Sequence, residues 1–198
     1  MNVAPRLGLT QEIGLAGRGI VRLARFDPRW WEAFDFSTTG FVRSFLARLL
    51  GLPFYLFFAA VIDRALSHGQ IGTWAALWPE TAAFLIDLVV YPLLIALIAR
   101  PLKIAAGYAA FIIVTNWTSL FLNVVLALVS VLATAGEGGL AVFGLFWFVL
   151  AGLAIFLTWR AARETLSHEL APVVLVVVLS VASGALIDQL VAWLSGHP

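Results

Sequence analysis

Two aspartates inside long apolar stretches are the residues of this sequence best placed to do chemistry. Asp87 lies six residues after the start of one stretch at Thr81, and Asp188 lies six residues before the end of another at Leu194. A carboxylate at the centre of a membrane helix costs about 2.5–3.5 kcal/mol, so such residues usually face the inside of a bundle and have a function. We expect the two carboxyl groups to share one depth and to bind a proton or a cation. Tyr91, one turn from Asp87, is an expected hydrogen-bond partner.

The alternative for these aspartates is that each is neutralised separately, by a hydroxyl, an amide or Arg64.

Two prolines and one arginine are further unusual residues inside the apolar stretches. Pro53 and Pro92 each remove a backbone hydrogen bond and predict a kink. Arg48 is predicted to reach back to the cytoplasmic headgroups, without a role of its own.

A second polar group occurs in the segment FIIVTNWTSLFLN. Small and polar residues recur from there at spacings of 3, 4, 4, 3 and 4, which places them on one face of a helix. In membranes, such faces mark close packing between helices. We therefore expect the amides to form hydrogen bonds between helices; the alternative is a polar pathway or ligand site. The face consists of Asn116, Ser119, Asn123, Ala127, Ser130 and Thr134.

The N-terminal segment predicts contact with lipid. A helix over residues 12–29 would carry arginines on one side and apolar residues on the other, as helices that lie in the headgroup plane do. Arginine in that plane meets anionic lipid headgroups. A docking surface for a protein partner is the alternative. The residues expected at the lipid surface are Arg18, Arg22, Arg25, Arg29, Trp30 and Trp31.

The elements that position these residues are predicted to be membrane helices. Of 198 residues, 62% are hydrophobic and 12% charged, and the mean hydropathy is +1.00. Soluble domains are nearer half apolar and a quarter charged. The expected fold is all-α: a cytoplasmic segment over residues 1–43, then a five-helix transmembrane domain over residues 44–198. The predicted spans are 44–62, 81–99, 104–134, 140–159 and 170–194.

The third span decides the topology. At 1.5 Å per residue its 31 residues would extend about 46 Å. Splitting the stretch near Asn116 would leave a first half too short to cross the membrane. With one helix there, Arg64 is the one basic residue in the loops of the far side, whereas ten lie on the N-terminal side. The positive-inside rule therefore predicts a cytoplasmic N-terminus and an external C-terminus, and the arginine-rich composition favours a bacterial inner membrane.

Several function classes are excluded or disfavoured. A net charge of +1 argues against nucleic-acid binding, and the chain has no cysteine for a thiolate site. The sequence contains no nucleotide-binding loop, no catalytic serine or zinc-protease motif, and no metal-ligand spacing. We therefore expect no enzyme activity, no catalytic residue, no metal and no cofactor.

The layout resembles the Yip1-type membrane protein family. Five spans follow an amphipathic N-terminal segment, the external C-terminus is short, and Gly107-Tyr108 at the start of the third span is similar to a Gly-Tyr element of that family. The resemblance implies a non-enzymatic role in membrane organisation, trafficking or complex assembly.

These features predict an accessory or organising subunit or scaffold that binds lipid and either another membrane protein or its own copies. The alternative is a small proton- or cation-coupled transporter or channel-like protein that uses Asp87, Asp188, Asn116 and Asn123. They differ in one structural respect: whether the polar side chains converge on a cavity or on dry helix contacts.

Overall fold

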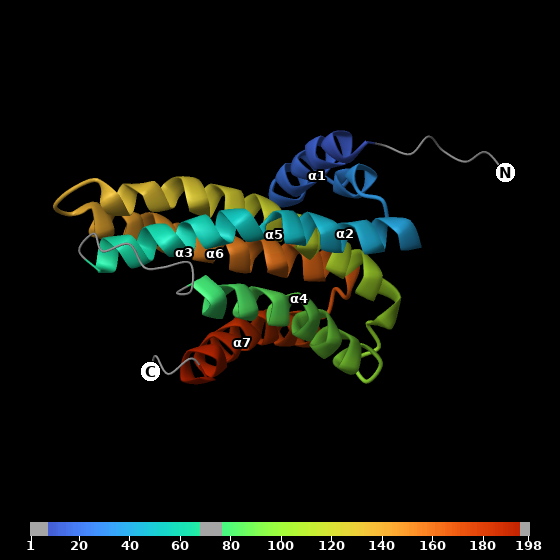
Figure 1. Ribbon diagram of the computed structural model, residues 1–198. Coiled ribbons are helices and arrows are strands. Elements are labelled where there is room, and N and C mark those ends of the chain that lie inside the picture. The colour runs from blue at the N-terminus through green and yellow to red at the C-terminus, as the bar shows by residue number, and fades with distance from the viewer. Residues whose placement is uncertain (1–7, 68–76, 195–198) are drawn as a thin grey trace.

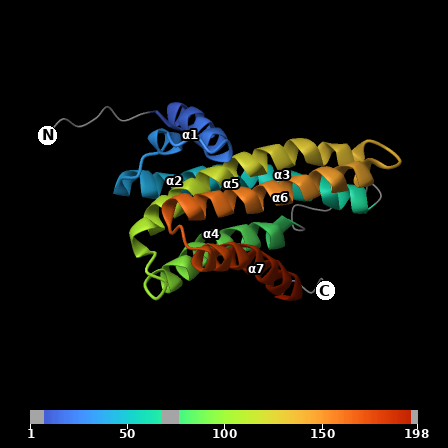
Figure 2. The same cartoon turned by 180° about the vertical axis from the view of Figure 1, so that it is seen from behind.

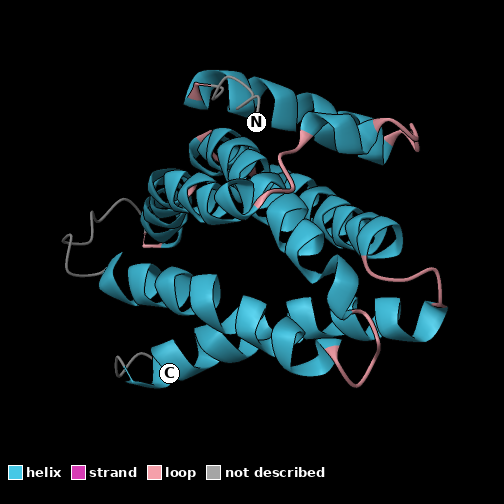
Figure 3. Cartoon of the chain, turned by 90° about the vertical axis from the view of Figure 1, so that its right-hand side faces the viewer, coloured by secondary structure: helices cyan, strands magenta, loops and turns pink. Residues whose placement is uncertain are grey.

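The computed structural model describes residues 8–67 and 77–194, apart from the side chain of residue 192. Within these ranges the chain forms helices joined by turns and short loops, with no strand (Figure 3). Five helical segments are long and apolar enough to cross a membrane, which confirms the prediction of an all-α integral membrane protein. They are Thr38–Leu66, Trp78–Ala99, Ala105–Thr134, Gly139–Thr165 and Leu170–Val191.

The segments lie side by side and alternate in direction (Figure 1). The first is made of two helices in line, and the third begins and ends in a short 3₁₀ turn, Ala105–Gly107 and Val131–Thr134. The α-helices are α2 (Thr38–Leu50), α3 (Leu52–Leu66), α4 (Trp78–Ala99), α5 (Tyr108–Ser130), α6 (Gly139–Thr165) and α7 (Leu170–Leu194).

α5 is the central helix of the bundle. Its residues 111–118 are all buried, and α1, α2, α3 and α6 pack around it. The prediction that this stretch forms one helix is confirmed, because the chain passes Asn116 without a break.

α4 and α7 form a pair at one side of this group (Figures 1 and 2). They pack mainly against each other, and α7 also packs on α6. Small apolar contacts hold the pair together near the N-terminal end of α4, where Ala83 meets Ile187 and Val191. The transmembrane bundle therefore has two parts, a tightly packed group around α5 and the α4–α7 pair.

The first span breaks at Gly51, between α2 and α3. Pro53 lies in the first turn of α3, so the predicted disturbance occurs, although the helix is interrupted two residues before the proline. A Cβ atom on Gly51 would lie 2.9 Å from the Arg48 carbonyl oxygen and 2.9 Å from Asn123 Nδ2. A larger residue at this break would therefore require the Asn123 side chain of α5 to shift. α4, by contrast, continues as a helix through Pro92.

The predicted N-terminal helix forms, as α1 (Leu9–Ala24), which begins and ends earlier than the expected range 12–29. Its apolar face, which includes Ala16, Ile20 and Leu23, is buried against the bundle, mainly on α5 and α6. The expectation that this face enters the lipid is therefore wrong. Neighbouring protein offers the same apolar surface that lipid would, at a fixed position.

Polar contacts hold α1 in place at both ends. Glu12 forms an ion pair with Arg43 of α2. At the other end, Arg160 of α6 donates from Nε at 3.3 Å to the Leu23 carbonyl oxygen, which also accepts a hydrogen bond from the Phe26 amide at 3.2 Å. The Arg160 guanidinium also lies 4.1 Å from the centre of the Phe26 ring.

The expected lipid-surface residues divide into three kinds. Arg18, Arg25 and Trp31 are exposed. Arg22 and Arg29 form ion pairs with Asp27, and Arg22 also with Glu32. Trp30 is only 6% exposed and packs against Phe34 and Phe36, so its expected contact with lipid is wrong. The predicted cytoplasmic segment 1–43 also includes residues 1–7, which lie outside the described residues.

Candidate functional site

The polar centre of the bundle is an ion pair between Arg48 of α2 and Asp87 of α4. Arg48 is 8% exposed and also donates from a terminal nitrogen to Asn116 Oδ1 at 3.5 Å. The prediction that this arginine reaches back to the headgroups is therefore wrong. α2 begins at Thr38, so Arg48 lies ten residues along it, about 15 Å at 1.5 Å per residue. At that depth, an internal carboxylate is a nearer partner than the headgroups.

A sequence signal for this depth exists. Ser37 is the N-terminal cap of α2, and its hydroxyl oxygen accepts a hydrogen bond from the Gly40 amide at 3.1 Å. The segment Ser37-Thr38-Thr39 has the composition of a helix start. Counting from that cap, rather than from the first uninterrupted apolar run at Ser44, would have identified Arg48 as an intramembrane residue.

Asn116 of α5 forms hydrogen bonds with two side chains of α2, those of Arg48 and Ser44. It is fully buried, and its Nδ2 donates to Ser44 Oγ at 3.0 Å. The Ser44 hydroxyl donates in turn to the Phe41 carbonyl oxygen at 2.7 Å. The prediction of an interhelical hydrogen bond is confirmed for Asn116.

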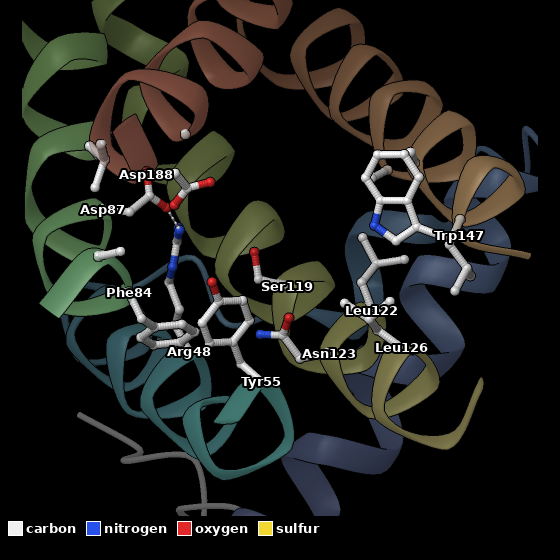
Figure 4. Close-up of a pocket in the computed structure, with 16 residues that line it drawn as sticks. Arg48, Tyr55, Phe84, Asp87, Ser119, Leu122, Asn123, Leu126, Trp147 and Asp188 are labelled. Atoms are coloured by element: carbon white, nitrogen blue, oxygen red, sulfur yellow. Dashed lines mark hydrogen bonds and ion pairs between the residues drawn. The ribbon is translucent and has the colours of Figure 1, made fainter. Parts of the chain in front are cut away.

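Both aspartates line a cavity of about 340 Å³ between the α4–α7 pair and α3, α5 and α6; we refer to it as the outer cavity (Figure 4). Ser119 and Asn123 of α5 contribute polar atoms to the same cavity, and so does Tyr55 of α3. Figure 4 shows the Asp87 and Asp188 side chains entering it from neighbouring helices, with the Arg48 guanidinium close to them. The two carboxylates thus share one cavity, as their matched depth predicts.

Asp188 differs from Asp87 in having no fixed partner. Among the residues that the structure describes, none forms a hydrogen bond or an ion pair with the Asp188 carboxylate. The alternative of separate neutralisation by Arg64 therefore has no support from these contacts. Glu80, nearer the outer end of α4, is different again, because it accepts a hydrogen bond from the Tyr55 hydroxyl at 2.6 Å.

A second cavity, of about 230 Å³, lies on the other side of the ion pair; we refer to it as the inner cavity. Arg48, Asp87 and Ser119 line both cavities. α7 contributes to both cavities and shows that they lie at different depths. Asp188, which lines the outer cavity, is six residues from Leu194 at the end of this helix, whereas Ser180, which lines the inner cavity, is fourteen residues from it. The ion pair therefore lies between two cavities at different depths.

Several hydroxyl groups line the inner cavity. Four of them donate to carbonyl oxygens of their own helices, at 3.0, 2.8, 2.9 and 2.7 Å for Thr115, Thr118, Thr158 and Ser180. Tyr91 also lines it and is 5% exposed, but its hydroxyl has no hydrogen-bond partner. Its expected hydrogen bond to Asp87 is therefore wrong. Arg48 Nε is the other buried side-chain atom without a partner in the described part of the chain.

The charges of this site are unequal. The walls of the two cavities carry two carboxylates, Asp87 and Asp188, and one guanidinium, Arg48. With all three ionised, the site carries one net negative charge, which favours uptake of a proton or a cation in a medium of low dielectric constant. The described residues contain no group of three metal-ligating side chains, so the arrangement does not resemble a transition-metal site.

Comparison with protein-family models, with curated proteins and with solved structures found no match to this chain. The resemblance to the Yip1-type family stays a prediction.

Proposed function

We propose that this protein is a small transporter that carries protons, or another small cation, across the membrane through its two central cavities. In this proposal Asp188 is the outer acceptor of the cation. The Arg48–Asp87 ion pair is the point at which the route is closed in the structure described here.

The observation that carries the proposal is the convergence of polar side chains on intramembrane cavities. Asp87, Asp188, Ser119 and Asn123 line one cavity instead of packing into dry helix contacts. An intramembrane ionisable residue that faces a cavity usually marks a substrate or ion pathway. A scaffold has no need of a carboxylate such as Asp188, which contributes no hydrogen bond to the described contacts and makes membrane insertion less favourable.

The two-part bundle supplies a means of opening the route. The α4–α7 pair carries both aspartates, whereas Arg48 belongs to the group packed around α5. A small movement of the pair would separate Asp87 from Arg48 without disturbing the core. Polar side chains from the two parts would then be free to exchange partners, as in transporters that move one group of helices against another.

The proposal also covers orientation and location. The arginine-rich N-terminal side is cytoplasmic and the outer cavity opens toward the external side, in a bacterial inner membrane. Transport of a proton forms no covalent bond in a substrate, so the protein has no enzyme activity and needs no cofactor. Contact of Arg18, Arg25 and Trp31 with anionic headgroups belongs to the same proposal.

Proton flux into liposomes tests this function. We expect purified protein, reconstituted with a pH-sensitive dye inside the vesicles, to acidify the lumen when a proton gradient and a potassium diffusion potential are imposed. Asp188→Asn is expected to lower the rate at least about tenfold, because it removes the outer acceptor. It should not lower stability, since this carboxylate has no bonded partner in the described chain.

Asp63→Asn is the matched control, because this aspartate lies at the exposed outer end of α3 and does not line either central cavity. Flux that is equal in wild type and Asp188→Asn would overturn the assignment of Asp188. A complete lack of flux, together with co-purification of a stoichiometric membrane partner, would favour the accessory-subunit function instead.

A further inference from the structure

The inner cavity contains two buried hydrogen-bond donors that nothing in the described structure satisfies. One is the Tyr91 hydroxyl and the other is the Nε–H group of Arg48. Both side chains are more than nine-tenths buried and both line the cavity. A buried donor without an acceptor costs about 1–3 kcal/mol, and more when it is charged, so this pair of donors favours a bound acceptor in the cavity.

The chemistry of the donors defines the class of ligand. An arginine cannot accept a hydrogen bond, and its planar group suits a carboxylate or another small anion. The tyrosine hydroxyl adds a neutral donor to the same space. Among the described residues, Arg48 is also the one positive charge on the walls of the two cavities. A small monovalent anion is the ligand that meets all three conditions.

In the structure described here, Asp87 already neutralises this positive charge. A second anion beside the ion pair would bring net negative charge into the bundle, which the low dielectric constant disfavours. A proton that enters from the outer cavity and binds an Asp87 carboxylate oxygen removes this obstacle. The Arg48 guanidinium then lacks its counter-charge, and the anion becomes its partner.

We propose that the inner cavity binds a small monovalent anion through Arg48 and Tyr91, and that the anion and a proton on Asp87 bind together. This inference rests on the proposed transport function and extends it. The transported species becomes an anion accompanied by a proton, which together are electrically neutral.

The titratable groups that face Asp87 are few. Arg48 approaches from α2, Tyr55 from α3 and Asp188 from α7, while Tyr91 belongs to its own helix. α5 and α6 present amides, hydroxyls and apolar groups to the cavities in the described structure. Glu80 lies further out on α4 and is bonded to Tyr55. Of the two carboxylates, Asp87 is the one that forms an ion pair with Arg48, so protonation of Asp87 removes the direct counter-charge of the guanidinium.

Anion-dependent thermal stability in detergent tests the inference. Sodium formate is titrated at constant ionic strength, set with sodium sulfate, at about pH 5.5 and about pH 8. A ligand that binds the folded state raises the melting temperature with its concentration. We expect wild type to be stabilised by formate at the lower pH, with an apparent affinity at least about tenfold weaker at the higher pH, where Asp87 keeps its charge.

Two variants separate the roles of the residues. Tyr91→Phe removes a buried hydroxyl without a partner in the described structure, so we expect equal or higher stability without formate and an affinity for formate about tenfold weaker. Asp87→Asn mimics the protonated carboxyl, so its affinity for formate should be the same at both pH values. Tyr108→Phe is the control, because that hydroxyl donates to the Pro92 carbonyl oxygen at 3.2 Å and lines neither cavity.

Equal formate effects in wild type and Tyr91→Phe, or no stabilisation by formate in wild type, would overturn the anion site. Proton flux that depends on Asp188 but occurs without a formate effect would leave the transport proposal in place and remove only this inference. Formate binding without proton flux, with formate present in the flux assay, would have the opposite meaning, a ligand site in a protein that does not transport protons.

Discussion

The guanidinium of Arg48 is held by groups from two other helices, the Asp87 carboxylate of α4 and the Asn116 amide of α5. Its charge is acceptable inside the bundle only because the aspartate compensates it and the amide oxygen adds a hydrogen bond. Arg48 and Asp87 should therefore be coupled energetically.

A double-mutant cycle measures this coupling. Asp87→Asn leaves a buried arginine without a counter-charge, and we expect it to lower the free energy of unfolding by about 3 kcal/mol. Arg48→Gln combined with Asp87→Asn should recover much of that loss, because no uncompensated charge remains. The measurement is unfolding in mixed micelles without added formate. If the two single changes are additive in the double variant, the ion pair does not contribute to stability.

At the scale of the element, α1 depends on close packing instead of lipid contact. Gly19 of α1 lies against the turn that follows: a Cβ atom there would be 2.5 Å from the Phe34 ring and 2.8 Å from Ala33 Cβ. Gly14, on the same helix, has no atom within 4 Å of the corresponding position. The two glycines therefore form a matched pair within one helix.

We expect Gly19→Ala to lower the free energy of unfolding by about 1–3 kcal/mol, as overpacking does. Gly14→Ala should leave it unchanged or raise it by up to about 1 kcal/mol, because alanine favours the helix. Limited proteolysis of the N-terminal segment and thermal unfolding in detergent provide the measurements. Equal behaviour of the two variants would contradict the docking of α1 on its neighbours.

At the scale of the whole molecule, five spans place the two ends of each helix on opposite sides of the membrane. Glu137 lies in the exposed loop before α6, and His168 lies in the exposed loop after it. With a cytoplasmic N-terminus, the first loop is external and the second is cytoplasmic. The chain contains no cysteine, so single cysteines report on each loop without interference.

We expect a membrane-impermeant maleimide to label Glu137→Cys in intact spheroplasts, and to label His168→Cys only after the membrane is permeabilised. Labelling in the reverse pattern would contradict the predicted orientation. If both cysteines react from the same side, α6 does not cross the membrane.

The sequence by itself determined which segments enter the membrane and which of their residues have unusual chemistry. Hydropathy and length are local properties, so five spans, the unbroken helix through Asn116 and the shared depth of Asp87 and Asp188 follow from the order of residues alone. The same patterns misplaced Trp30 and the apolar face of α1, because an apolar face is satisfied equally by lipid or by protein.

Only the tertiary structure decided which helices are neighbours, and therefore which charges meet. Arg48 and Asp87 are 39 residues apart and Arg48 and Asn116 are 68 apart, so no spacing along the chain predicts their contacts. The same holds for the two cavities, whose walls come from several helices, and for the unsatisfied donors of Tyr91 and Arg48. Side-chain periodicity specifies the faces of one helix, whereas packing between helices specifies what each face meets.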